Sequence, residues 1–477
     1  MQRSERNSAP LHTKGVGGGR QTRDHGSDFQ SARIYLSPTH KTLDSSAQIE
    51  RQGMHTLVAT AAIVCLSFGS NVLLSRALGP SGKGVIDLAN ATTALFSLVL
   101  GGSLAAGLTK VVAQHRGVPA VLARPLTIWM TLAVLLTTGW LASAPQLSIR
   151  LGLLPAQPGW FWIVYLSIAI MLALALAQIR GALVGLQALI GVNRIEIGVK
   201  AATLVMFALL PLLSGAGTKA FALAALAGNA GMTFAFALLL RWRWKPATSG
   251  SWHELLQFSM SLHGANVLYY VTQRIDVFFV QAQHGSSEVG IYALAVTLTQ
   301  ILLLASNAFA LPLLPSISAQ SDPAVATGAT SRVVRLYLSL SVIGAIMLAA
   351  VMSWALPLVF GVAFAPSLMP MLILLPGVIA FGLTNILISY FFGRGHARYN
   401  LALSFSGLII TIVGNMALTP RFGAIGAAIT STIAYTWSGV LALAGLARFG
   451  KLTWREIMQP RMSEFREFAG QLRNFRF

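Results

Sequence analysis

Long apolar runs are the feature that most constrains this chain. Stretches of 18 or more predominantly apolar residues recur from Thr56 to Ala447. Each can cross about 30 Å of hydrocarbon as an α-helix, which satisfies its own backbone hydrogen bonds as lipid requires. Hydrophobic residues make up 55% of the chain and charged residues only 10%, whereas a soluble protein carries roughly 25% charged residues. The sequence therefore predicts an all-α polytopic membrane protein.

The apolar runs predict about twelve transmembrane helices, at 56–77, 85–109, 126–144, 160–180, 196–214, 219–240, 256–281, 289–313, 333–356, 368–391, 399–418 and 424–447. The nearly continuous run 160–192 would be about 50 Å long as one helix, so it must tilt, break or protrude. Residues 1–55 are polar without hydrophobic periodicity, which predicts a disordered cytoplasmic tail. The basic, amphipathic stretch 448–477 is expected to be a cytoplasmic tail on the inner membrane surface.

An internal repeat divides the apolar region. The pattern of Leu78–Asn90 returns 206 positions later in His284–Val296, and the same offset places Gly217 on Gly423. The residues Gly79, Ser81, Gly84, Leu88 and Ala89 fall on Gly285, Ser287, Gly290, Leu294 and Ala295. We interpret this as one unit of about six helices present twice, with lobes at 56–240 and 256–447 and a cytoplasmic linker at 241–255.

Lysine and arginine predict the orientation. Loops on one side of the predicted membrane hold Lys110, Arg116, Arg124, Arg194, Arg241, Arg243, Lys245, Arg332, Arg335, Arg394 and Arg398, and both tails are basic. The opposite loops hold Arg76, Lys83, Arg150, Lys219 and Arg421. Both termini are therefore expected in the cytoplasm, and the two lobes are expected to form a parallel repeat about the membrane normal. This topology also accounts for the net charge of +20, so nucleic acid is not an expected partner.

The sequence contains few residues that could carry metal, redox or hydrolytic chemistry. The single cysteine, Cys65, lies inside the first apolar run, and the nine histidines have no HExxH spacing. Catalytic carboxylate pairs or Ser/His/Asp sets would need acidic residues that the predicted spans mostly lack. Neither an enzymatic activity nor a metal or other cofactor is expected.

The seventh predicted span, 256–281, carries the most polar side chains. Within about 100° of the helix circumference it presents Ser259, His263, Asn266, Tyr270, Gln273 and Arg274. Such a stripe avoids lipid, because unsatisfied polar groups there cost several kcal/mol. It could line a substrate cavity or form a helix–helix seam whose polar groups satisfy one another. Arg274 is hard to satisfy in a seam, which favours the cavity.

Asp276 points away from Arg274, because side chains two residues apart on a helix diverge. It therefore needs a partner on another helix, or it lies in water at the outer mouth. A proton or sodium site is a further possibility.

Four basic residues lie at the ends of predicted spans, and two of them have two possible roles each. Arg180 and Lys200 could extend to the lipid headgroups or line a site for a phosphate-bearing substrate. Arg76 and Lys83 lie at the outer end of the first span, where Asp87 could pair with either.

Small polar and glycine residues inside the spans predict helix packing. Single asparagines in apolar spans are more typical of interhelical hydrogen bonds than of ligand contacts. These are Asn71, Asn90, Asn229, Asn307, Asn385 and Asn415. The GxxxG pair Gly181 and Gly185 indicates close helix packing.

Several short motifs of glycine, proline and small residues mark the ends of the predicted spans. They are Ser75–Ala89, Gln273–Asp276 with Val289–Ala295, Leu311–Ser318, Gly361–Pro366 and Asn415–Thr430. These motifs resemble those of bacterial polysaccharide flippases of the O-antigen and exopolysaccharide type. The resemblance covers about residues 56–447. That family is similar in fold to multidrug and toxin extrusion transporters and to flippases of the peptidoglycan lipid precursor.

The resemblance implies two six-helix lobes around a central cavity in the bacterial inner membrane. It also implies alternating access that carries undecaprenyl-diphosphate-linked oligosaccharide from the inner to the outer leaflet. Membrane lipids, a polysaccharide polymerase and export machinery are the implied partners. The candidate cavity residues are Arg274, Asp276, Arg180, Lys200, Arg76, Asn266, Tyr270, Gln273 and His263.

Three alternatives make different predictions. A cation-coupled multidrug exporter would carry acidic residues in its spans, and this chain offers Asp87, Glu196 and Asp276. A flippase of the peptidoglycan precursor would typically have more spans. A membrane polymerase or ligase would have a large external loop with basic and catalytic residues, and no connection here exceeds roughly twenty residues between predicted spans.

Overall fold

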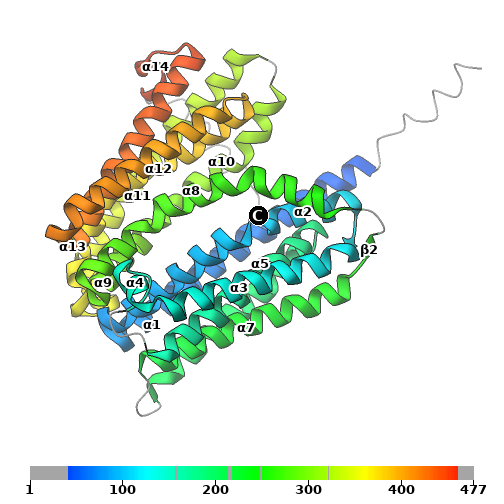
Figure 1. Ribbon diagram of the computed structural model, residues 1–477. Helices are drawn as coiled ribbons and strands as arrows, with labels where there is room; N and C mark the ends of the chain where they lie inside the picture. Colours follow the sequence, from blue (N-terminus) through cyan, green and yellow to red (C-terminus); the bar gives the residue numbers. More distant parts are fainter. Residues whose placement is uncertain (1–40, 156–158, 213–216, 248–249, 321, 460–477) are drawn as a thin grey trace, which may run out of the picture. The chain divides into compact units, whose positions relative to one another are not determined.

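The computed structural model describes residues 41–155, 159–212, 217–247, 250–320 and 322–459 (Figure 1). The chain divides into two compact units, Met1–Met54 and His55–Phe477. In the first unit, helix α1 begins at Lys41. The predicted disordered tail 1–55 lies largely outside the described residues and stays a prediction. Extending an existing helix costs far less than nucleating a new one, which favours helix ahead of the first apolar run. The second unit contains all of the other helices.

Helices make up nearly all of the described chain. The first half contains α1 (Lys41–Gly101), α2 (Leu104–His115), η2 (Ala120–Leu122), α3 (Ala123–Ser143), α4 (Pro145–Arg150), α5 (Trp160–Gly185), α6 (Leu189–Leu209), η3 (Leu210–Leu212) and α7 (Thr218–Arg243). The second half contains α8 (Trp252–His284), α9 (Ser286–Thr299), α10 (Ile301–Ala319), α11 (Pro323–Phe360), η4 (Val362–Ser367), α12 (Leu368–Gly393), α13 (Ala397–Gly450) and α14 (Trp454–Met458). Two short strands, β1 (Val118–Pro119) and β2 (Pro246–Ala247), pair in parallel.

Glycines with left-handed backbone divide the longest helices. Helix α1 is two helices joined at Gly79 (φ 62°, ψ −175°), and α13 is two helices joined at Gly423 (φ 53°, ψ −129°). Glycine adopts these angles without the Cβ clash of other residues. Pro80 follows Gly79 at the start of a helix, where a missing N–H leaves no hydrogen bond unmade. Both breaks lie where the sequence predicted a turn between spans.

Nine helices of the described chain are long and apolar enough to cross a membrane. Two of them, in α1 and α13, contain the glycine breaks, and α8 with its polar stripe is not among the nine. The fold is an all-α polytopic membrane protein, as predicted, while the number twelve stays a prediction.

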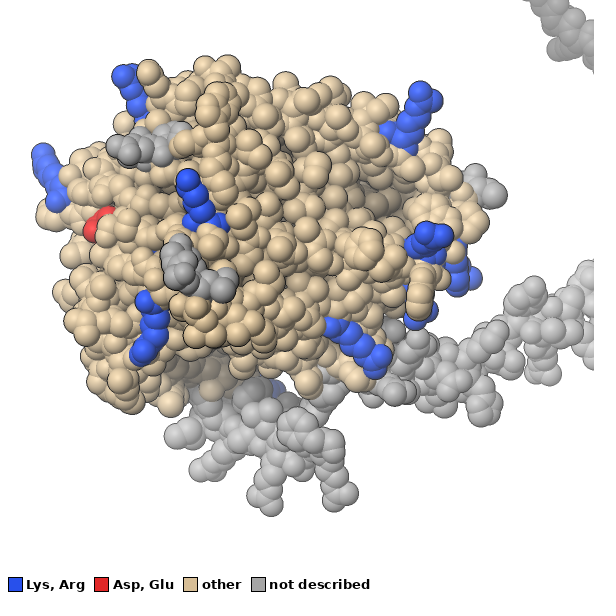
Figure 2. All heavy atoms as spheres, turned by 90° about the horizontal axis from the view of Figure 1, so that it is seen from below, with Lys and Arg blue, Asp and Glu red and all other residues tan. Residues whose placement is uncertain are grey.

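Exposed apolar side chains fit this assignment. Large apolar residues remain exposed along the helices, among them Leu132, Leu135 and Leu136 of α3 and Ile346 and Met347 of α11. On the face in Figure 2, uncharged residues cover most of the described surface, and the Lys and Arg side chains lie mostly near its margins, several of them together at the right. Such a surface is unfavourable in water but costs little in lipid.

Helix α5 is central to the packing of the first half. It contacts α2, α3 and α7, which lie beside it in Figure 1. A Cβ atom on Gly181 would lie 2.5 Å from the Ala105 carbonyl oxygen, and Thr109 Oγ1 donates a hydrogen bond of 2.9 Å to the Gly181 carbonyl. The predicted close approach at the GxxxG pair is therefore confirmed. The run 160–192 also breaks, at Gln187 (φ 60°) between α5 and α6.

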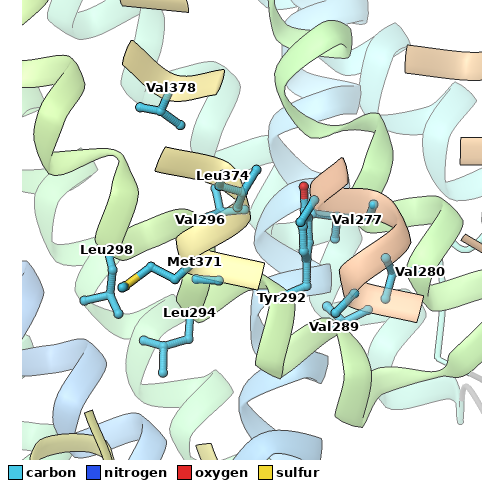
Figure 3. Packing of buried hydrophobic residues seen from close by; sticks show 14 of the residues in the cluster. Val277, Val280, Val289, Tyr292, Leu294, Val296, Leu298, Met371, Leu374 and Val378 are labelled. Carbon is cyan, nitrogen blue, oxygen red and sulfur yellow. The ribbon is translucent and has the colours of Figure 1, made fainter. Parts of the chain in front are cut away.

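Helix α12 is central to the packing of the second half, as α5 is in the first, and it contacts α9, α10, α11 and α13. In the most apolar stretch of Val362–Gly393, which contains α12, 61% of the residues are buried. The corresponding share for Leu189–Leu212, which contains α6, is 6%. Figure 3 shows part of this core, with Tyr292 close to Val277 and Val289. Tyr292, Leu294 and Val289 have no exposed surface.

The two halves meet through a reciprocal contact of equivalent residues. A Cβ atom on Gly84 would lie 1.7 Å from the Ser286 carbonyl oxygen, and one on Gly290 would lie 2.0 Å from the Pro80 carbonyl oxygen. The sequence offset of 206 relates Gly84 to Gly290 and Pro80 to Ser286. Gly285 (φ 79°, ψ −175°) also matches the backbone of Gly79. A self-complementary contact of this kind is expected between two copies related by a two-fold axis, in agreement with the predicted repeat.

Candidate functional site

A cavity of about 440 Å³ lies among helices α1, α6, α7, α8 and α9, and it draws residues from both halves of the chain. Its size is typical of small-molecule sites, which span about 300–1,000 Å³. Many of its lining side chains are polar: Ser70, Asn71, Asp87, Asn90, Lys200, Thr203, Asn229, Tyr270, Arg274 and Thr297. So polar a wall between membrane helices indicates a site for water or for a polar ligand.

Two cations face this cavity from opposite halves, Lys200 on α6 and Arg274 on α8. Both are partly buried. Arg274 Nη2 donates a hydrogen bond of 3.3 Å to Gln300 Oε1, which occupies one of the five donors of a guanidinium. Within the described residues, neither cation forms an ion pair. Both charges are therefore available to an anionic ligand.

The carboxylate of Asp87 also lines the cavity, but it is paired. Asp87 Oδ2 accepts a hydrogen bond from Lys83 Nζ one helical turn away on α1. The Lys83 side chain is fully buried and that of Asp87 is 19% exposed. Lys83 is therefore the partner of Asp87, and it is not the outer-loop charge that the sequence predicted. Because the pair is neutral, Lys200 and Arg274 leave the cavity cationic.

The polar stripe of α8 is divided between two environments. Tyr270 and Arg274 line the cavity, and the Tyr270 hydroxyl donates a hydrogen bond of 2.9 Å to the Ala91 carbonyl of α1. His263 and Asn266 lie in a seam against Ser103, with contacts of 3.4 Å from His263 Nδ1 and 3.1 Å from Asn266 Nδ2 to Ser103 Oγ. Both of the environments considered from the sequence are therefore present on one helix.

Gln273 lines a second cavity of about 20 Å³ inside the second half. Tyr292, Gln300 and Tyr435 also line it. Its volume is sufficient for about one water molecule. Gln273 is thus separated from the larger cavity although its neighbour in sequence, Arg274, lines that cavity.

Asp276 is buried away from the cavity, with 1% of its surface exposed. Its carboxylate accepts hydrogen bonds from the Tyr292 hydroxyl of α9, from Ser431 Oγ of α13 at 3.0 Å and from the Val277 backbone N–H at 2.8 Å. The partner on another helix that the sequence required is therefore present. The Tyr292 and Ser431 donors connect α8 to α9 and to α13.

Arg180 and Arg76 both lie outside the cavity lining. Arg180 Nε forms an ion pair of 2.9 Å with Glu196 Oε1, and the Arg180 side chain is 52% exposed. Arg76 Nε donates to the Val359 carbonyl at 2.8 Å, and its Nη2 donates to the Leu358 carbonyl. These carbonyls belong to the last turn of α11, where they have no acceptor role within the helix. Arg76 therefore connects α1 of the first half to α11 of the second.

Asn71, Asn90 and Asn229 line the cavity, although their sequence context predicted interhelical hydrogen bonds. The predicted interhelical hydrogen bond is present for two other asparagines, because Asn385 Nδ2 donates to Asn307 Oδ1 at 2.7 Å. One signal was present in the sequence: Asp87 and Asn90 are three residues apart and so share a helix face. That shared face is polar, like the stripe on α8, and both faces contribute residues to the cavity lining.

Among the described residues, no cluster of three or more His, Cys, Asp or Glu side chains could hold a metal ion. The lining of the cavity offers charged groups and hydrogen-bonding groups to a ligand.

Comparison with known proteins identifies relatives of this chain. Residues 73–369, more than half of the chain, match the sequence model of a family described as polysaccharide biosynthesis protein. No protein of curated function matches the chain in sequence.

Three solved structures share the fold. The lipid II flippase MurJ in an inward closed conformation is 12% identical, with a TM-score of 0.61 over 88% of this chain and 93% of MurJ. An inward-facing multidrug resistance MATE transporter of the MOP superfamily is 16% identical, with a TM-score of 0.57 over 82% and 95%. The Vibrio cholerae MATE transporter VcmN is 12% identical, with a TM-score of 0.56 over 85% and 97%. The fold is therefore that of membrane transporters and flippases.

Proposed function

Because the chain belongs to the polysaccharide biosynthesis protein family, we propose that it flips a lipid-linked oligosaccharide across the bacterial inner membrane. The proposed substrate is an oligosaccharide joined to a polyprenyl carrier, such as undecaprenol, through a diphosphate. Transport runs from the inner to the outer leaflet by alternating access, with both termini in the cytoplasm. The proposed moving lobes are residues 56–240 and 256–447, joined by the linker 241–255.

The observation that carries this proposal is the cationic cavity between the two halves. A diphosphate is negatively charged and cannot cross hydrocarbon unaided. Lys200 and Arg274 line one cavity from different halves, and an arginine can hold two phosphate oxygens at once. A ligand bound by side chains of both halves would couple its own translocation to the movement of the two halves. The lipid tail needs no site, because it remains in hydrocarbon.

A proposed sequence of events follows from this geometry. The headgroup enters from the cytoplasmic leaflet and exchanges water for Arg274, Lys200 and the polar wall. The halves then separate at the end where Gly84 contacts Ser286 and Gly290 contacts Pro80. The headgroup leaves to the outer leaflet, where a polysaccharide polymerase and export machinery would receive it.

Arg274→Ala tests the proposal directly. Charge-assisted hydrogen bonds contribute about 1.5–3 kcal/mol, so translocation of a fluorescent undecaprenyl-diphosphate disaccharide in proteoliposomes should fall roughly 10- to 100-fold. Lys200→Ala should act in the same direction. Arg180→Ala is the matched control, because Arg180 is an exposed arginine outside the cavity lining. Unchanged translocation by both cavity variants would contradict the proposed role of these cations.

A cation-coupled multidrug exporter is the second candidate, and it is favoured by the carboxylate of Asp87 in the cavity lining. The pairing of Asp87 with Lys83 weakens that candidate. Deleting the gene in its host separates the two. A flippase predicts lipid-linked oligosaccharide retained on the cytoplasmic face, reversed by the wild-type gene. Normal export together with sensitivity to cationic drugs would instead identify an exporter.

A further inference from the structure

We propose that Asn90 and Asn229 form a sugar-binding subsite that distinguishes a glycan-bearing lipid from the bare polyprenyl diphosphate. This inference rests on the proposed function, because it assigns the part of the cavity beside the phosphate-binding cations. The ligand class is the first sugars of a lipid-linked glycan, with their hydroxyl and acetamido groups.

The first argument is that both amides lack a partner. Asn90 and Asn229 line the cavity with exposed side chains. Within the described part of the chain, neither side chain has a hydrogen bond, whereas Asn71 Nδ2 donates to the Ser67 carbonyl at 3.0 Å. Membrane proteins satisfy their polar groups internally unless these meet water or a ligand. Two free amides in one cavity therefore point to a polar ligand.

The second argument is depth. Asn90 lies about 11 residues beyond Gly79, Asn229 about 12 beyond Gly217, and Arg274 about 11 before Gly285. At 1.5 Å per residue, Asn90 and Asn229 lie roughly 16–18 Å from the N-terminal ends of their helices, and Arg274 lies as far from the C-terminal end of α8. These ends lie together, because Gly82 is next to Thr218 and Pro80 is next to Gly290. The amides and the arginine thus share one level of the cavity, near the depth at which transporters commonly bind their substrates.

The third argument is chemical. A primary amide offers two donors and an acceptor, which suits sugar hydroxyl and acetamido groups. Asp87, three residues before Asn90 on the same face of α1, adds a carboxylate acceptor. Phosphate needs only donors, so it would leave these acceptors unused. A site built to hydrogen-bond hydroxyl groups discriminates strongly against a ligand that lacks them.

The test compares two probes on the purified full-length protein: undecaprenyl diphosphate, and undecaprenyl diphosphate that carries an N-acetylated disaccharide. We expect the wild type to bind the disaccharide lipid more tightly. Asn90→Leu and Asn229→Leu should each reduce that preference about three- to tenfold, because they should weaken binding of the disaccharide lipid more than binding of the bare diphosphate. Asn307→Leu is the matched control, because Asn307 lies outside the cavity lining and bonds Asn385.

The outcomes separate this inference from the proposed function. Equal binding of both probes by the wild type, or an undiminished preference in both cavity variants, would overturn the subsite and leave the flippase proposal standing. Binding of neither probe by the wild type would overturn both. If a leucine variant does not fold, Asn90→Ala and Asn229→Ala provide the same comparison without added bulk.

Discussion

At the scale of single residues, Lys83 is a buried charge in the first half and requires a partner of opposite charge. Its ammonium group is fully buried, and Asp87 is its partner within the described chain. Removing one member of a buried pair leaves an uncompensated charge, which costs far more than replacing both members. The pair also prevents the Asp87 carboxylate from repelling an anionic ligand in the cavity.

Lys83→Met should therefore destabilise the protein by roughly 3 kcal/mol or more, and it should weaken binding of undecaprenyl diphosphate. The double variant Lys83→Met with Asp87→Asn should recover most of both losses, because no charge is left unpaired. Thermal unfolding in detergent and lipid-binding titrations would measure these effects. Additive losses in the double variant would contradict the coupling.

At the scale of elements, α1 and α9 touch backbone to backbone. This contact depends on Gly84 and Gly290, whose missing side chains admit the Ser286 and Pro80 carbonyls of the opposite half. A carbonyl cannot move aside as a flexible side chain can, so even one methyl group must separate the helices.

Gly84→Ala and Gly290→Ala should each lower the unfolding temperature or the yield of folded protein, with a cost of about 1–3 kcal/mol from overpacking. Gly198→Ala in α6 is the matched control, because a Cβ atom there would meet nothing within 4 Å. That control should be neutral or slightly stabilising, since alanine favours helix over glycine. Circular dichroism melts of the three variants would decide, and equal behaviour would count against the tight contact.

At the scale of the whole second unit, the halves are also held by Arg76. Its guanidinium bonds the Leu358 and Val359 carbonyls at the end of α11, and Phe68 packs edge-on against Phe360 with ring centroids 5.6 Å apart. The proposed alternating access would require these contacts between α1 and α11 to break when this end opens.

Arg76→Ala should shift the population towards separated halves, since it removes hydrogen bonds that join α1 to α11 in this structure. Spin labels at Leu212 and Val362, each 79% exposed, would report the distance in a Cys65→Ser background. The expected result is a longer or broader distance distribution than in the unsubstituted background. The control is Arg421→Ala, because Arg421 is another exposed arginine, and it should leave the distance distribution unchanged. Identical distributions for both variants would argue against a role of Arg76 in holding the halves together.

Sequence alone determined the membrane assignment, the glycine breaks and the repeat. Apolar runs of spanning length have few alternatives to helix in lipid, and Gly79, Gly285 and Gly423 adopt backbone angles that other residues avoid. Such properties are local or periodic, so they can be read without knowing which helices are neighbours.

Only the tertiary structure decided which polar residues share the cavity. Helical spacing places His263, Asn266, Tyr270 and Arg274 on one face of α8, but it does not say that α2 covers the first two while a cavity meets the others. Likewise, nothing local distinguishes Asn90, which is free, from Asn385, which bonds Asn307. The partner of a side chain is set by the packing of segments far apart in sequence, and periodicity within one helix carries no information about that packing.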